Sequence, residues 1–216
     1  MIDFHSHTLL SDGLLLPTEL ARRAQAKGYK ALAITDHVDS SNLEDVLEKL
    51  LRFSDQYKAP DGFTLVVGVE ITHVAPAQIG PMVTRARELG AQIIICHGET
   101  IVEPVIEGTN LASIEAGADI LAHPGLITDS ETELAAKNGV YLELTTRGGH
   151  SLTNGHVAAS AKKNDANLVL NSDSHAPSDL ITVEMARSVV LGAGLDESDL
   201  RRIQDNAQVL LDKVSR

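Results

Sequence analysis

The stretch Ile2-Asp3-Phe4-His5-Ser6-His7 opens the chain with a short apolar run that ends in two histidines one residue apart. Successive side chains of a β-strand point to opposite faces, so residues two apart point the same way. His5 and His7 can therefore reach one ion together from the end of one strand. The stretch Asp173-Ser174-His175 repeats this spacing near the other end of the chain.

Six further runs are similar to the first and predict buried strands. They are brief, rich in Ile, Val and Leu, and mostly continuous rather than alternating, which is typical of a parallel sheet covered by helices. The seven predicted strands are Ile2 to Phe4, Ala31 to Thr35, Leu65 to Val69, Gln92 to Cys96, Asp119 to Ala122, Val140 to Leu144 and Leu168 to Asn171.

Helical patterns lie between these strands, several with proline near the start or glycine just past the end. The regular alternation of strand and helix predicts βαβ units and an α/β fold with parallel pairing. A closed or nearly closed barrel is the preferred architecture, and a doubly wound open sheet is the alternative. The predicted helices are Pro17 to Gly28, Asn42 to Gln56, Pro81 to Leu89, Glu131 to Lys137, Asn154 to Lys163, Asp179 to Val190 and Asp196 to Val214.

Length and composition limit the class of protein. The 216 residues contain no linker or repeat, which predicts a single domain over residues 1–216. The formal net charge of −12 argues against a dedicated duplex-DNA binder. A single cysteine, no basic signal region and no apolar run near the ~18 residues of a membrane span predict a cytoplasmic protein without membrane contact. The sequence predicts no particular oligomeric state.

Histidines and carboxylates gather where the predicted strands end. In a parallel barrel these ends converge on one face, where active sites are built. Imidazole and carboxylate donors without thiolates suit Zn²⁺, Mn²⁺ or Fe²⁺. Cys96 adjoins one of these histidines, so strand alternation turns it away from the metal face, and we expect a small buried hydrophobe there. The residues at strand ends are His5, His7, His37, Glu70, His97, His123, Asp173 and His175.

Short motifs carry these residues in a fixed order along nearly the whole chain. They are Asp3 to Thr8 followed by Ser11 to Gly13, then Ile34 to His37, Gly68 to Glu70, Cys96 to Gly98, Ala122 to Pro124 and Asn171 to His175. This ordered set resembles the motifs of the PHP (polymerase and histidinol phosphatase) domain family. The resemblance implies a distorted (β/α)7 TIM-like barrel with two or three divalent metal ions at its carboxyl-terminal rim and hydrolysis of phosphate esters.

The resemblance also implies a ligand set, in which Glu70 bridges the first two ions and, with Asp173, carries the catalysis. The first ion would be held by His5, His7, Glu70 and Asp173, the second by Glu70, His97 and His123, and the third by Asp12, His37 and His175.

Such a site is cationic and attracts anions, because three divalent ions outweigh three ligand carboxylates when the imidazoles bind as neutral bases. A metal-bridging hydroxide is the predicted nucleophile for in-line attack on phosphorus. Asp36, Glu99 and His150 are candidates for protonating the leaving oxygen, with orientation of the neighbouring His37 as the alternative role of Asp36.

A glycine-containing segment, Thr145 to Asn154, follows the sixth predicted strand on the same rim. Arg147 there could grip a phosphate bidentately, with His150 and Asn154 as further substrate-binding candidates. Aromatic residues are only 3% and no basic groove is evident, so nucleic acid is an unlikely partner. These features favour a small phosphate monoester, in the manner of a histidinol phosphatase.

Two other functions stay open. An amidohydrolase-like barrel also begins with His-x-His, but it commonly bridges its metals with a modified lysine, and no predicted strand end carries one. A non-catalytic, metal-stabilised PHP module would usually have lost ligands that this chain retains. We expect neither His73 nor His156 to be a ligand, and Glu143 could be a buried charge paired with Arg147.

Overall fold

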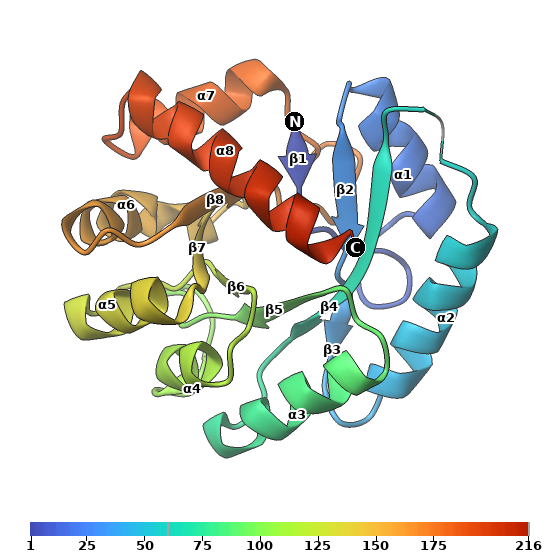
Figure 1. The fold of residues 1–216 in the computed structure, drawn as a ribbon, viewed down its shortest axis with the longest axis horizontal. Helices are drawn as coiled ribbons and strands as arrows, with labels where there is room; N and C mark the ends of the chain where they lie inside the picture. The colour runs from blue at the N-terminus through green and yellow to red at the C-terminus, as the bar shows by residue number, and fades with distance from the viewer. Residues whose placement is uncertain (60, 216) are drawn as a thin grey trace.

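The computed structural model describes residues 1–59 and 61–215 and shows parallel strands arranged around a central axis (Figure 1). A further short strand, β3 (His37–Val38), comes after β2 in the chain, and both pair with β4. The strands follow one another around the sheet in the order β1 (Ile2–Asp3), β2 (Ala31–Ile34), β4 (Thr64–Ile71), β5 (Ile93–His97), β6 (Ile120–Ala122), β7 (Tyr141–Thr145) and β8 (Leu168–Asn171).

The first and last strands come together just beyond their ends. Ser6 and Ser174 form a parallel β-bridge, and the backbone N–H of His7 donates to the carbonyl of Ser174 at 2.8 Å. The backbone N–H of Phe4 donates to the side chain of Asn171 at 2.9 Å. These contacts make the sheet a nearly closed barrel, which confirms the preferred architecture over the open sheet.

Helices surround the barrel, and most of them match the predicted ranges. The third begins at Pro76 rather than Pro81, because Pro76 takes the first-turn position that proline favours and the exposed Pro81 is accommodated within the helix. The short α4 was not predicted. The helices are α1 (Pro17–Ala26), α2 (Leu43–Gln56), α3 (Pro76–Glu88), α4 (Thr109–Glu115), α5 (Asp129–Asn138), α6 (Asn154–Lys163), α7 (Val183–Gly192) and α8 (Glu197–Val214), with a 3-10 turn η1 (His150–Thr153) before α6.

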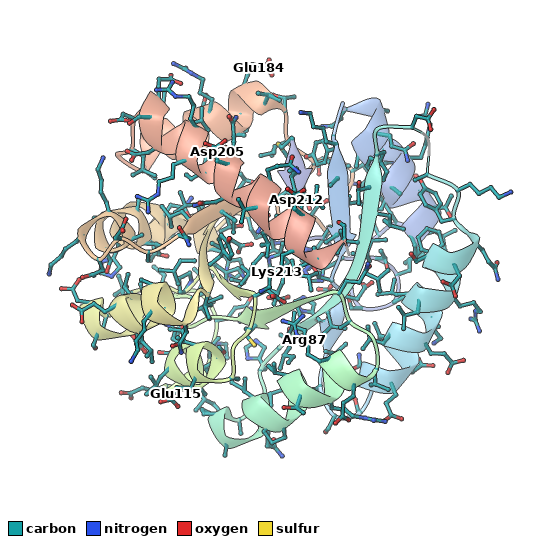
Figure 2. All side chains as sticks on the ribbon, in the orientation of Figure 1. Arg87, Glu115, Glu184, Asp205, Asp212 and Lys213 are labelled. Atoms are coloured by element: carbon teal, nitrogen blue, oxygen red, sulfur yellow. The ribbon has the colours of Figure 1, made fainter. Side chains whose placement is uncertain are left out.

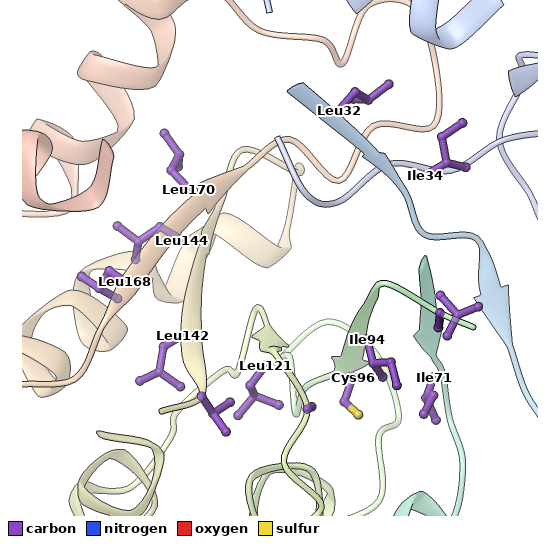
Figure 3. Packing of buried hydrophobic residues seen from close by; sticks show 14 of the residues in the cluster. Leu32, Ile34, Ile71, Ile94, Cys96, Leu121, Leu142, Leu144, Leu168 and Leu170 are labelled. Carbon is purple, nitrogen blue, oxygen red and sulfur yellow. The ribbon is translucent and has the colours of Figure 1, made fainter. Parts of the chain in front are cut away.

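Two apolar layers hold the barrel together. The inner layer fills the barrel with alternate strand residues, among them Phe4 and Ile95, and the end of α8 packs into it. The outer layer lies between strands and helices and includes Ile94 and Cys96 (Figure 3). Cys96 is thus turned away from the barrel interior, as predicted, and burial raises the pKa of its thiol to about 12.

Helix α8 lies across the amino-terminal end of the barrel (Figure 1). Arg87 of α3 and Lys213 of α8, both labelled in Figure 2, pair with the buried Asp119 at the start of β6. This end of the barrel is therefore covered, which leaves the carboxyl end of the strands for the functional groups. Within the two described ranges, no helix is long and apolar enough to cross a membrane.

Candidate metal centre

All nine predicted ligands lie at the carboxyl-terminal end of the barrel. A cavity of about 410 Å³ opens there, and six of the nine line it. The other three, His5, His7 and Glu70, are buried, with no more than 1% of each exposed. The six that line the cavity are Asp12, His37, His97, His123, Asp173 and His175.

The carboxylate of Glu70, near the end of β4, lies at the centre of the group. Its Oε2 is 3.2 Å from Nε2 of His5 and 3.5 Å from Nε2 of His7. The same oxygen is 2.8 Å from Nδ1 of His37, while Oε1 lies 3.8 Å from Nε2 of His123. The two oxygens of one carboxylate therefore face different imidazoles, which is the arrangement a bridging ligand needs.

Asp173 faces the same group from the loop after β8. Its Oδ1 lies 3.2 Å from Nε2 of His7, and its Oδ2 lies 3.8 Å from Nε2 of His123. Both Asp173 and His123 have positive φ angles, 51° and 26°, which non-glycine residues rarely adopt. Such strained backbone is held in place by the surrounding fold and is concentrated at functional sites.

The donor atoms of this group are arranged to bind a metal ion rather than to form hydrogen bonds with one another. Nε2 of His5, Nε2 of His7 and both carboxylate oxygens of Glu70 are buried without a hydrogen-bond partner, although they lie close together. Nδ1 of His37, the nitrogen nearest to Glu70, bonds the hydroxyl of Thr72 at 2.7 Å instead. Buried polar atoms are normally paired. Two ligands bonded to one zinc ion at about 2.1 Å lie roughly 3.0–3.4 Å apart, close to the separations seen here. The residues present therefore fit divalent ions.

A more exposed group surrounds Asp12, whose side chain is 57% exposed. Its Oδ1 lies 3.1 Å from Nε2 of His175 and 3.6 Å from Nε2 of His37. His7 also has a nitrogen within 4.8 Å of these donors. The group matches the set that the resemblance implies for a third ion.

Asp36 contacts the loop that carries Asp12. Its carboxylate accepts hydrogen bonds from the backbone N–H and hydroxyl of Thr8, both at 2.7 Å, and from those of Ser11 at 3.1 and 2.7 Å. Asp36 is fully buried and is not among the residues that line the cavity. This arrangement favours positioning of the loop over direct proton transfer.

Glu143 of β7 orients the ligands rather than pairing with Arg147, so that expectation is wrong. One oxygen lies 2.8 Å from Nδ1 of His5 and the other accepts the backbone N–H of His123 at 3.0 Å. Arg147 instead pairs with Asp179 at 3.3 Å. The carboxylate of Glu143 thus fixes which nitrogen of His5 is free to bind an ion.

The predicted substrate-binding residues separate into two groups. Arg147 and His150 line the cavity. Asn154 instead uses its amide for two hydrogen bonds to the backbone of Thr145, at 3.1 and 2.8 Å, because it begins α6 directly below that strand end. Its role is to hold the loop.

Sequence reasoning missed Glu103, a cavity-lining residue of the loop between β5 and α4. Glu99 of the same loop accepts hydrogen bonds from the backbone N–H groups of Gly108 and Asn110, at 3.0 and 2.9 Å. Its carboxylate therefore stabilises the loop conformation. Neither residue lies in a regular element or in a motif, so only the loop conformation reveals their different roles. His156 bonds the carbonyl of Ile127 at 2.7 Å, away from the candidate ligands.

The charges of the centre are strongly coupled. Burial alone would lower the pKa of His5, but the charges of Glu143 and Glu70 outweigh it and raise that pKa well above its usual value. Burial would raise the pKa of Glu70, but the nearby His5 and His37 hold it well below its usual range. Burial lowers the pKa of His7 to about 4. In metal-free protein these shifts favour the protonated form of His5, the neutral form of His7 and the charged form of Glu70.

Comparison with known proteins agrees with the resemblance seen in the sequence. The family model described as PHP domain matches residues 3–116. A protein of Methanocaldococcus jannaschii described as uncharacterized is 47% identical over 92% of both chains. A 5'-3' exoribonuclease of Haemophilus influenzae is 37% identical over 32% of this chain and only 23% of its own length.

The fold also matches a solved structure. Histidinol phosphate phosphatase from Lactococcus lactis, solved with zinc, L-histidinol and phosphate, superposes with a TM-score of 0.64 at 17% identity, over 90% of this chain and 94% of that chain. At this identity the similarity supports the barrel architecture alone.

Proposed function

This chain belongs to the PHP domain family of metal-dependent phosphoesterases, and we propose that it hydrolyses a small phosphate monoester at the centre around Glu70. The observation that carries the proposal is the buried carboxylate of Glu70, whose two unpartnered oxygens face separate imidazole groups. A structural carboxylate at this depth would be hydrogen-bonded. The ligand roles assigned to the nine residues are part of the same proposal.

Each part of the chain contributes a different task. Divalent ions bound here would lower the pKa of a coordinated water and offset the charge on phosphoryl oxygens. Glu143 holds the imidazole of His5 in position, and Asp36 holds the loop that carries Asp12, since each carboxylate accepts hydrogen bonds from the group it positions. Arg147 lines the cavity and would bind the phosphoryl group, because its planar guanidinium suits the phosphoryl oxygens.

The lining of the cavity favours a small substrate. Arg147 is its single lysine or arginine among the described residues, and no aromatic side chain other than histidine lines it. Strand-binding proteins use a basic groove with aromatic stacking platforms. The absence of a lysine from the described lining also disfavours an amidohydrolase-like centre, in which a modified lysine bridges the metals.

A second candidate is removal of nucleotides from the 5' end of a short RNA. The partial match to a 5'-3' exoribonuclease favours it, although that match covers about a quarter of the relative's length. A terminal nucleotide needs far less basic surface than a long strand, so a cavity with one arginine does not by itself exclude this substrate.

A substrate panel separates these functions. The protein is stripped of metal, reconstituted with Mn²⁺ or Zn²⁺, and assayed on small phosphate monoesters, on phosphodiesters and on a short 5'-phosphorylated RNA. We expect release of inorganic phosphate from monoesters, at a rate more than about 100-fold lower in the Glu70→Gln variant. Faster release of nucleotides from the RNA would replace the monoesterase proposal with the second candidate, and inactivity on every ester would overturn both.

A further inference from the structure

Glu103 brings together three histidines at the mouth of the cavity. Its Oε2 lies 3.1 Å from Nε2 of His73 and 3.1 Å from Nε2 of His97. Its Oε1 lies 3.3 Å from Nε2 of His150. One carboxylate thus faces three imidazoles from three separate segments, namely the loop after β4, the end of β5 and the turn η1. His73 and His150 lie outside the ligand set described above.

A backbone contact of His97 determines which of its nitrogens faces Glu103. Nδ1 of His97 lies 3.1 Å from the carbonyl oxygen of Gly98, so Nδ1 carries a hydrogen. Nε2 is therefore the ring nitrogen that faces the carboxylate of Glu103. The separations also fit donors that share one ion, which lie roughly 3.0–3.4 Å apart for metal–ligand bonds of about 2.1 Å.

Exposure places this group between solvent and the buried centre. The side chains of His73 and Glu103 are 42% and 36% exposed, whereas that of His97 is 3% exposed. His97 has nitrogen donors near both His73 and Glu103 on one side and near Glu70 and His123 on the other. It is therefore the residue through which the outer and inner groups meet.

The loop that carries Glu103 is held in place. The carboxylate of Glu99 accepts the backbone N–H groups at the start of α4, and the side chain of Asn110 donates to the carbonyl of Pro124 at 2.9 Å. Nδ1 of His150 lies 2.8 Å from the hydroxyl of Thr100, which directs Nε2 toward Glu103. The outer group is a built arrangement of donors rather than a chance contact of surface side chains.

We propose that His73, His97 and Glu103 form a further divalent-cation site, through which ions reach the buried ligands. Nε2 of His97 has one lone pair, so it binds one ion at a time. An ion first held by His73 and Glu103 can then transfer inward while His97 stays bound to it. The site lies outside the ligand set of the proposed function and acts before catalysis begins.

The rate of metal uptake tests this site without relying on activity. Full-length protein stripped of metal is mixed with limiting Zn²⁺, and free zinc is followed with a chromogenic chelator. His73→Ala and Glu103→Gln should each slow uptake by about 10-fold, the lower end of the cost of removing a supporting group at a metal site. The final number of ions per chain at saturating zinc should equal that of the wild type.

Two variants provide matched controls. Glu107→Gln removes an exposed carboxylate from the same loop, and His156→Ala removes an exposed histidine outside the cavity. Both should take up zinc at the wild-type rate. Equal uptake rates in all four variants would overturn the outer site alone, whereas wild-type protein that takes up no zinc would overturn the proposed metal centre as well.

Discussion

One oxygen of Glu143 lies 2.8 Å from Nδ1 of His5, with both side chains fully buried in the barrel wall. The same oxygen accepts the side-chain N–H of Asn171 at 2.8 Å, so its position is fixed from a second strand. An imidazole whose Nδ1–H is bonded to a carboxylate presents Nε2 as the donor and becomes more basic. Two adjacent strands, β7 and β8, therefore determine which nitrogen of the β1 loop faces the candidate ions.

Replacing Glu143 with glutamine should weaken metal binding while the fold survives. The amide keeps the shape of the side chain but can present its N–H₂ group to His5. Nδ1 of His5 then no longer has to carry the hydrogen, so Nε2 is no longer fixed as the metal-binding nitrogen. We expect metal affinity to fall by roughly 10- to 100-fold, as for other groups that orient a metal ligand. Calorimetric titration of metal-stripped protein with Zn²⁺ measures this, and Glu133→Gln on the exposed face of α5 is the control. Unchanged affinity would show that Glu143 only fills space.

Glu70→Gln should have a larger effect. One carboxylate faces both ligand groups, so loss of its charge affects two ions at once. Metal occupancy measured by elemental analysis should drop, and turnover should fall by more than about 100-fold. If the variant retains its full metal content and turns over substrate normally, Glu70 does not bridge the ions.

Metal binding should release protons and strengthen as pH rises. Nearby carboxylates, opposing the effect of burial, raise the pKa values of His5, His37 and His97, so these rings hold protons more tightly than free imidazole does in metal-free protein. A metal ion must displace those protons, because only the deprotonated ring binds it. The dissociation constant should therefore fall with rising pH, roughly tenfold per pH unit for each proton released.

Calorimetry in buffers of different ionisation enthalpy counts these protons directly. A positive number that declines as the pH rises is expected, since at higher pH the rings lose their protons before the ion arrives. A dissociation constant independent of pH between 6 and 8 would contradict the charge coupling described for the centre.

The positions of the candidate ligands could be predicted from sequence because strand ends and motifs mark them. His5, Glu70 and Asp173 lie at such ends, and parallel strands bring their ends together whatever the details of packing. The contacts of Glu103 and Asn154 could not be predicted. Both depend on the conformation of loops, in which no periodic pattern in the sequence predicts where a side chain points. Glu143 lies within a strand, but its partner His5 lies just beyond the end of β1, 138 residues away in the sequence.

Gly98 should tolerate no side chain. A Cβ at this position would lie 2.3 Å from the carbonyl oxygen of Ala122, so Gly98→Ala must push apart the loops that carry His97 and His123. We expect a loss of about 1–3 kcal/mol in the free energy of unfolding, typical of overpacking, together with weaker metal binding. Thermal and denaturant unfolding measure it. Gly80→Ala in α3, where a Cβ meets nothing within 4 Å, should not destabilise the protein.

Arg147 distinguishes a phosphoesterase from its alternatives. Asp179 holds its guanidinium at 3.3 Å and also accepts the backbone N–H groups of His175 and Ala176, at 3.0 and 2.8 Å. The arginine is therefore tied to the loop of a candidate ligand. If it grips phosphoryl oxygens, Arg147→Ala should raise KM and weaken inhibition by inorganic phosphate while metal content stays unchanged.

The expected loss for Arg147→Ala is about 1.5–3 kcal/mol, or roughly 10- to 150-fold in kcat/KM, typical of a hydrogen bond to a charged group. Arg147→Lys should recover only part of it, because a point charge cannot reproduce the two parallel hydrogen bonds of the guanidinium. Arg22→Ala on the exposed side of α1 is the control. An alanine variant that binds phosphate as tightly as the wild type would mean that the metal ions alone hold the anion.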